Sequence, residues 1–294
     1  MTRKASTQSA LITTAFAATL LCCAALTAQS VPDRVAVPLT DPARSVRLQA
    51  GLVNGSITVK VHAAQNVIVE ARARIEEGAS EKRGAKRLVF IPSTGLTVEE
   101  ENNEVQVSAD SVQHPVDLTI LVPARTSVNL RTVNDGNISV SGINGEIDVD
   151  NVNGDVTLQD VSGYAVAHAL NGELKANFKS IDTQKPMAFS SLNGDIEVAF
   201  PPDLKATVSL ASDRGDVFSD FDIQLQARGP QQIVEDARGK GGKFRVRVEK
   251  TIRGTINGGG QEIQFKNFNG SIYIRKAAAA VAPAKPATPA TNPR

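Results

Sequence analysis

The sequence is poor in the residue types that most often carry chemistry. It has two cysteines, three histidines, two tyrosines and no tryptophan among 294 residues. Cys22 and Cys23 both lie in an N-terminal segment that we expect to be removed, so the mature chain would have no disulfide, thiolate metal site or cysteine nucleophile. His62, His114 and His168 are far apart in the sequence, and none belongs to a paired metal-ligand spacing. We expect these histidines to be surface or hydrogen-bonded residues.

The motifs of common enzyme classes and of nucleic-acid binders are also missing. The sequence has no Ser-His-acid spacing and no Gly-x-Ser-x-Gly motif, which argues against nucleophilic hydrolysis. After removal of Arg3 and Lys4, 30 basic residues face 31 acidic ones, a net charge of about −1 that does not suggest polyanion binding. Lys243, Arg245 and Arg247 form a basic stripe without interleaved aromatics, so a solvated face is favoured over a nucleic-acid site.

Residues 1–30 have the pattern of a secretion signal peptide. Arg3 and Lys4 give a positive start, residues 10–28 are uncharged and apolar, and Ala28-Gln29-Ser30 is a small-x-small cleavage site. A transmembrane anchor is the alternative, and the apolar run is close to the minimum length for that role. A lipoprotein is disfavoured because neither cysteine follows a small residue. We expect an exported protein of the periplasm or cell surface, with no membrane span in the mature chain.

One short phrase recurs through the chain: apolar, Asn-Gly, acid, apolar, polar, apolar. The copies centre on Asn144-Gly145, Asn153-Gly154, Asn171-Gly172 and Asn193-Gly194, with earlier and later relatives at Asn54-Gly55 and Asn269-Gly270. With Ser162, which holds the same position as these asparagines, the copies from residue 144 to residue 171 are spaced by nine, and the next follows after 22. Two strands per coil then give about 18 to 22 residues per turn, which is plausible for a solenoid.

The phase of the apolar residues separates a solenoid from an antiparallel meander, which Asn-Gly turns also suggest. The apolar positions of one stretch, Ile147, Val149, Val152, Val156 and Leu158, break period-two alternation twice. A single meander strand would place some of these side chains on its solvent face, whereas a coil with corners keeps all five in the core. We predict an all-β parallel β-helix, or β-solenoid, right-handed because parallel crossovers usually are. Glycine would supply the left-handed corner conformations.

The flanking segments set the domain limits. We predict a single solenoid domain over residues 31–276, with N-terminal strands in 31–125 and the Asn-Gly repeats in 126–276. An apolar share of 41% is enough for a core, which we expect to be built from valine, isoleucine and leucine rather than aromatics. Residues 76–87 and 229–242 are expected to be loops, and the Ala- and Pro-rich residues 277–294 a disordered tail.

Several segments resemble a known bacterial family. They are the strand from Val116 to Pro123, the segment from Val128 to Ile138, and the Asn-Gly repeats through Val198. Over residues 46–275 the sequence resembles the bacterial "putative adhesin" or β-strand-repeat domain of unknown function. The resemblance implies an exported parallel β-helix and carries no catalytic signature.

Stacked coils would also form a ladder of acidic side chains. If consecutive repeats form consecutive coils, one edge of the solenoid carries a side chain from each coil, with neighbouring coils about 4.8 Å apart. These side chains are Asn137, Asp155, Glu173, Asp195 and Asp216. Their oxygens suit Ca²⁺, but acids beside Asn-Gly are ordinary turn chemistry, and we favour side chains that extend into water. We therefore expect no cofactor and no metal.

The favoured function is a non-enzymatic, adhesin-like binding or scaffold protein of the bacterial cell envelope. Its partner would be an envelope polysaccharide or another protein, and the sequence does not give the oligomeric state. One alternative is a β-helix carbohydrate-active enzyme, for which Asp148 with Asp150, or Asp213 with Asp216, would supply the acid pair. Another is an accessory domain in the envelope-stress response.

Overall fold

The computed structural model contains strands and no helix in the residues it describes, which are 32–74, 94–110, 114–226, 231–236, 244–249 and 251–277. No helix in those ranges is long and apolar enough to cross a membrane. The predicted signal peptide, the 76–87 loop, residues 278–294 of the predicted tail and the side chains of the basic stripe lie outside the described residues. Of the expected 229–242 loop, residues 231–236 are described, and they form a strand instead.

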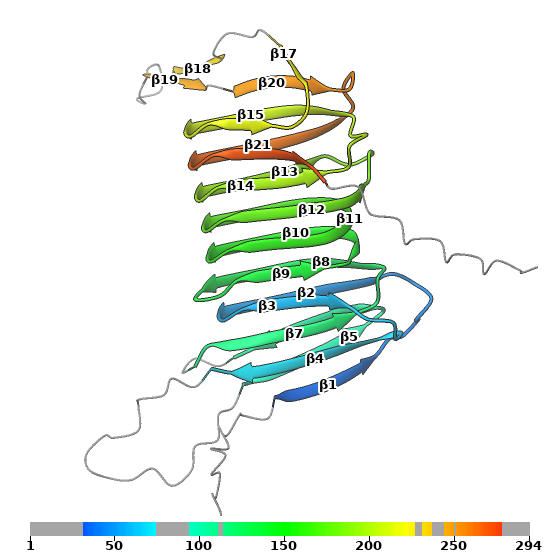
Figure 1. Cartoon of the computed structure of the whole chain (residues 1–294). Coiled ribbons are helices and arrows are strands. Elements are labelled where there is room, and N and C mark those ends of the chain that lie inside the picture. Colours follow the sequence, from blue (N-terminus) through cyan, green and yellow to red (C-terminus); the bar gives the residue numbers. More distant parts are fainter. Residues whose placement is uncertain are drawn as a thin grey trace, which may run out of the picture.

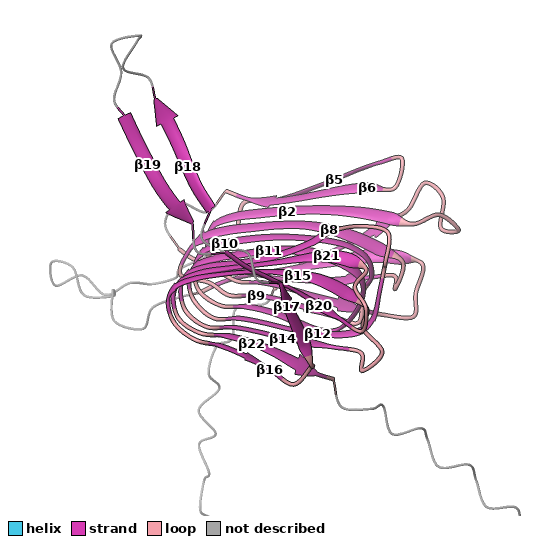
Figure 2. Ribbon diagram, turned by 90° about the horizontal axis from the view of Figure 1, so that it is seen from above, coloured by secondary structure: helices cyan, strands magenta, loops and turns pink. Residues whose placement is uncertain are grey.

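The strands wind around one core as a flattened coil made of two sheets (Figures 1 and 2). We call the sheet that contains β6, β2 and β8 the front sheet; it lies along the upper side of Figure 2 and on the far side of the molecule in Figure 1. In spatial order the front sheet contains β5 (Leu96–Glu101), β6 (Glu104–Ala109), β2 (Val46–Asn54), β8 (Thr126–Asn134), β10 (Asn144–Asn153), the second half of β11 (Val156–Asn171), β13 (Met187–Asn193), β21 (Gln261–Asn269), β15 (Ala206–Arg214), β20 (Thr251–Ile256) and β17 (Ile223–Gln226).

The back sheet contains, in the same direction, β1 (Asp33–Pro38), β4 (Asn66–Ala73), β7 (Val116–Val122), β3 (Ile57–Val61), β9 (Ile138–Ser141), the first half of β11, β12 (Leu174–Ile181), β14 (Ile196–Phe200), β22 (Ile272–Lys276) and β16 (Val217–Ser219). In the described residues, β18 (Gln231–Asp236) and β19 (Phe244–Glu249) pair with each other alone. Consecutive central coils pair in parallel at offsets such as Asn144 to Ser162 and Val166 to Ala188. The predicted all-β parallel solenoid, with 18 to 22 residues per coil, is confirmed.

The coils do not stack in sequence order at either end, contrary to the simple one-coil-per-step prediction. The β2–β3 coil lies between β6–β7 and β8–β9, and the β21–β22 coil lies between β13–β14 and β15–β16 (Figure 1). Antiparallel strands then complete each end, through β1–β4–β7 and β5–β6 at one and β15–β20–β17 at the other. Long-range pairing therefore fixes both ends of the solenoid.

The core is mostly valine, isoleucine and leucine, as expected, but it also contains a phenylalanine cluster that was not. Phe178 stacks on Phe200 with centroids 5.5 Å apart, and Phe189 stacks on Phe265 at 5.4 Å. The two stacks meet edge to face between the front and back sheets. Such aromatic pairs contribute about 0.5–1.5 kcal/mol each beyond their buried area.

The residue before Asn-Gly points outward at Gly55, Gly154, Gly172, Gly194 and Gly270, which corrects the prediction for Val152. Ile143, before Asn144-Gly145, is buried. On β10, Ile147, Val149 and Asn151 are buried, and Val152 lies on the outer surface, half-buried. Period-two alternation therefore continues to the corner, and a polar asparagine takes the last inward position. The corner begins one residue later than the apolar pattern alone suggested.

The glycines of the corners form a column in which each approaches the coil before it. A Cβ added to Gly154 would lie 2.2 Å from the carbonyl oxygen of Gly136, and one added to Gly172 would lie 2.1 Å from that of Gly154. The same contact recurs along the column, from Gly136 against Gly55 to Gly215 against Gly270. Gly154 also has a φ of 138°, in the region that favours glycine. Close approach is thus the stricter reason for glycine at the corners.

Substitution of a column glycine tests this constraint. In Gly154→Ala the new methyl group would overlap the Gly136 carbonyl, so we expect a loss of about 3 kcal/mol in the free energy of unfolding. Urea denaturation measures it. Ser141→Ala, at an outward position of β9, should stay within about 0.5 kcal/mol of the parent. Equal urea midpoints for Gly154→Ala and the parent would show that the glycine column can accommodate a methyl group.

Candidate binding surface

A ladder of hydrogen bonds involves most of the residues that directly follow a corner glycine. The side chain of one coil accepts a hydrogen bond from the backbone N–H at the equivalent position of the next coil. The bonds run from Ser56 N to Asp117 Oδ1 (3.1 Å), Asn137 N to Ser56 Oγ (3.1 Å), Asp155 N to Asn137 Oδ1 (2.9 Å), Glu173 N to Asp155 Oδ1 (2.8 Å), Ser271 N to Asp195 Oδ1 (2.7 Å) and Asp216 N to Ser271 Oγ (3.4 Å). These bonds satisfy backbone donors that the sheets leave free at the corner.

The predicted acidic ladder exists in part and has a structural use. Asp155, Glu173 and Asp195 do lie on adjacent coils of one edge. Asp216 does not follow Asp195, because the inserted β21–β22 coil places Ser271 between them. Glu173 pairs with Lys175. In the described ranges, no three His, Cys, Asp or Glu side chains come together in a way that could hold a metal ion.

A second ladder is made of the asparagine side chains that precede the glycines. Each amide nitrogen donates to the amide oxygen of the previous coil: Asn153 to Asn134 (3.1 Å), Asn171 to Asn153 (2.9 Å), Asn193 to Asn171 (2.7 Å) and Asn269 to Asn193 (2.8 Å). From the sequence, Asn-Gly predicted only a corner conformation, and this role of the asparagine side chain was not predicted. The regular recurrence of asparagine at one coil position was the available signal.

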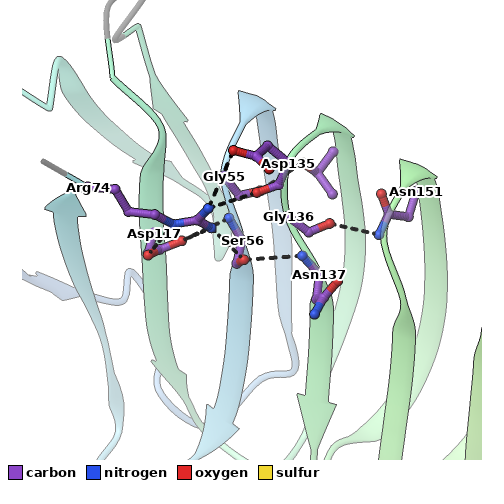
Figure 3. Close-up of polar contacts among 9 residues, drawn as sticks. Gly55, Ser56, Arg74, Asp117, Asp135, Gly136, Asn137 and Asn151 are labelled. Carbon is purple, nitrogen blue, oxygen red and sulfur yellow. Dashed lines mark hydrogen bonds and ion pairs between the residues drawn. The ribbon is translucent and has the colours of Figure 1, made fainter. Parts of the chain in front are cut away.

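Buried polar side chains support the corner from inside. Each donates to the carbonyl oxygen of a corner glycine on the previous coil: Thr132 to Gly55 (2.9 Å), Asn151 to Gly136 (3.0 Å), Ser191 to Gly172 (3.2 Å) and Asn267 to Gly194 (2.9 Å). Figure 3 shows the bond from Asn151. A buried carbonyl without a partner is costly, so these bonds explain the polar residue at the last inward position of β8, β10, β13 and β21. On β2 and β11 the same position holds Leu52 and Ala169.

An arginine anchors the first of these ladders, formed by the residues after the corner glycines and called the outer ladder, at its β7 end (Figure 3). Arg74 donates to both carboxylate oxygens of Asp117, at 2.8 and 2.6 Å, and also to Ser56 Oγ and the Asp135 carbonyl oxygen. Partial burial raises the pKa of Asp117, but hydrogen bonds from Arg74 and the Ser56 N–H outweigh it, so that pKa lies below its usual value. The hydrogen bond to Asp117 raises the pKa of Arg74.

An apolar row lies on the outer surface of the front sheet, beside the asparagine ladder. Its members are Val53, Val133, Val152, Leu170, Leu192 and Phe268, one from each of six neighbouring strands. Val53 is 65% exposed, and Val133, Leu170, Leu192 and Phe268 are between 38% and 43% exposed. At a strand spacing of about 4.8 Å the row is about 24 Å long. Arg214 covers the ring of Phe268 at the end of the row.

The acid pairs considered for an enzyme do not converge on a cleft. Asp148 and Asp150 both point outward from β10, and Asp148 accepts a hydrogen bond from Asn129. Asp213 and Asp216 lie on opposite sides of the Gly215 corner. Neither pair lines the two grooves near β5 and β6. The histidines His62 and His168 are hydrogen-bonded to the Asn66 carbonyl oxygen and to Ser190 Oγ.

A protein-family model matches more than half of the chain. Residues 97–258 match the family model described as Toastrack DUF4097, which confirms the resemblance to a bacterial β-strand-repeat domain of unknown function. No curated protein matches the chain. The crystal structure of a "putative cell adhesion protein" from Clostridium sporogenes ATCC 15579 aligns at 12% identity and a TM-score of 0.40, over 84% of this chain and 100% of that one. A likeness this distant carries no inference about function.

The role of the corner acids can be tested at Asp155. Asp155→Asn keeps an acceptor for the Glu173 N–H, so its free energy of unfolding should match the parent. Asp155→Ala removes the acceptor and should lose about 1 kcal/mol. Thermal denaturation with and without calcium completes the test. A calcium-dependent rise in melting temperature that Asp155→Ala abolished would contradict a purely structural ladder.

The anchor predicts a pH dependence of stability. Because the pKa of Asp117 is lower in the folded than in the unfolded chain, its stabilisation is present above the unfolded value of about 3.9 and is lost as pH falls through the folded value. We expect Asp117→Asn to cost about 1 kcal/mol at pH 7, with the difference from the parent vanishing towards pH 2. Urea denaturation across this range measures it. Glu262→Gln, at an exposed position of β21, serves as the control, and a pH-independent cost at Asp117 would refute the mechanism.

Proposed function

The chain belongs to the Toastrack DUF4097 family, and from this premise we propose that it is a non-enzymatic, exported, adhesin-like binding or scaffold protein of the bacterial cell envelope. Its partner, an envelope polysaccharide or another protein, would dock along the apolar row of the front sheet. The single observation that carries the proposal is this row of exposed apolar side chains, one per coil, bordered by polar ladders.

Five of the nine exposed large apolar residues in the described structure lie in the apolar row. The other four, Val35, Phe218, Leu225 and Ile252, lie on strands towards the two ends of the solenoid. Isolated exposed apolar residues are normal on protein surfaces, but a contiguous group rimmed by polar residues marks an interaction site. The row is also straight and periodic, since register fixes each member beside the next. A partner that meets one coil therefore meets five more with the same chemistry.

A binding role also accounts for what the polar residues of the corner do. The outer acids accept backbone hydrogen bonds, and the asparagines bond to one another. Groups engaged in this way are poorly suited to acid–base catalysis, which needs a carboxyl free to exchange a proton with the substrate. Export is supported by the positive start, apolar run and cleavage site of residues 1–30.

Introducing positive charge into the apolar row tests whether this row is the docking surface. The double variant Leu170→Lys/Leu192→Lys places two ammonium groups in the middle of the row, where a docked partner would have to desolvate them. We expect binding to separated polysaccharide and protein fractions of the envelope to weaken at least about tenfold, equivalent to about 1.4 kcal/mol. Surface-immobilised full-length mature chain and the variant are compared by their equilibrium binding curves.

The matched control places the same charges on the back sheet. Ser139→Lys/Thr157→Lys occupies adjacent outward positions of β9 and β11, and it should bind as the parent does. Unchanged binding by the front variant would remove the proposed surface, and release of product from a polysaccharide would favour the enzyme alternative. Recovery of the chain from the periplasm or culture fluid with its first 28 or 30 residues absent would support export, and its retention in the cytoplasm would oppose it.

A further inference from the structure

Gly51 differs from the other glycines of the described structure. It lies inside the nine-residue strand β2, points outward, has an ordinary backbone conformation, and would have nothing within 4 Å of an added Cβ. Every other glycine in the described ranges either has a positive φ or would clash with a neighbouring atom. Glycine inside a strand costs about 0.5–1 kcal/mol relative to alanine. No contact among the described residues therefore explains glycine at this position.

Gly51 forms the floor of a groove on the outer surface of the front sheet. The groove has a volume of about 490 Å³, within the range of small-molecule sites. Two outward residues from each of four adjacent strands line it. One line across the strands is Glu99, Gln106, Gln49 and Asn129, and the other is Thr97, Ser108, Gly51 and Arg131. Small residues at Ser108 and Gly51 make the hollow, with Thr97 and Arg131 at its two ends.

The polar groups of the groove are arranged before any ligand arrives. Gln49 Nε2 donates to Glu104 Oε1 at 2.5 Å, and Asn129 Nδ2 donates to Asp148 Oδ2 at 2.8 Å. These bonds fix both amides and leave their oxygens as acceptors. Arg131 is exposed and has no ion pair in the described part of the chain, although Asp150 is its register neighbour on β10. The groove thus offers amide and hydroxyl groups with one guanidinium and one carboxylate.

We infer that this groove is a binding site for an uncharged oligosaccharide, with Gly51 leaving room for a sugar ring. Amides, hydroxyls, Glu99 and Arg131 together provide donors and acceptors for a ligand rich in hydroxyl groups, with no excess of one charge. A glycine within a strand is a known mark of close approach by a ligand. The site lies beside the end of the apolar row but uses different side chains, so it does not depend on that row.

A peptide fits this groove less well than a sugar. Extended peptides add to sheets along a free edge, through backbone hydrogen bonds. Here the groove lies on the face of four paired strands, and the backbone groups of β2, β6 and β8 are already used within the sheet. The lining also lacks an apolar pocket for a peptide side chain, since its apolar members Ala50 and Val107 are buried in the core.

Filling the groove tests the inference. Neutral linear gluco-, manno- and galacto-oligosaccharides are titrated into the full-length mature chain by calorimetry. We expect at least one to bind, Gly51→Phe to abolish that binding, and Arg131→Ala to weaken it about tenfold. Gly51→Ala should bind nearly as the parent does and raise the melting temperature, because alanine favours the strand without filling the groove.

Matched controls separate the groove from the fold and from the apolar row. Ala211→Phe puts the same ring in the corresponding line of outward positions on β15, at the other end of the front sheet, and should leave binding intact. Leu170→Lys/Leu192→Lys should also bind the oligosaccharide normally. The site is refuted if none of the neutral sugars binds, if Gly51→Phe binds as well as the parent, or if only charged glycans or peptides bind.

Discussion

The close approach of each corner glycine to the carbonyl oxygen of the coil before it is the constraint on which the rest of the structure depends. With less than 2.4 Å between that oxygen and the position of a Cβ, no other residue fits without displacing the backbone. The approach brings the next N–H within reach of a side-chain oxygen on the previous coil, so the outer ladder can form. It also aligns the preceding asparagines. Both ladders therefore follow from the glycine column.

The sequence predicts the repeating part of this fold well, because the spacing of the repeated motif along the chain also gives the register between neighbouring strands. Once Asn153-Gly154 is a corner, so is Asn171-Gly172, and their 18-residue offset is the sheet register. The two ends are different. The β21–β22 coil pairs with β13–β14 and with β15–β16 across gaps of 76 and 55 residues, and no local pattern marks that insertion. Val152 was wrongly placed inside because a hydropathy pattern does not reveal the glycine carbonyl oxygen to which the inward-facing Asn151 donates a hydrogen bond.

The candidate surfaces were harder to predict than the coil for a related reason. Asp155, Glu173 and Asp195 were placed correctly on one edge, but their role depends on which backbone N–H lies beside each oxygen, and that is a property of the tertiary structure. The apolar row was hidden because Val53, Leu170 and Leu192 look like core residues in the sequence. Gly51 looked like any other glycine until the space around it was known.

A solenoid of this kind separates the residues that hold it together from those available for recognition. Groups at the corner are used by the neighbouring coil: the glycine by its shape, the asparagine by its amide, and the acid by its oxygen. A partner cannot use them fully without weakening the stack. Recognition must then come from outward positions within the strands, where few side chains form a hydrogen bond to the backbone of a neighbouring coil. The apolar row and the groove over Gly51 both consist of such positions, and they can differ between related solenoids without any change to the corner that builds the coil.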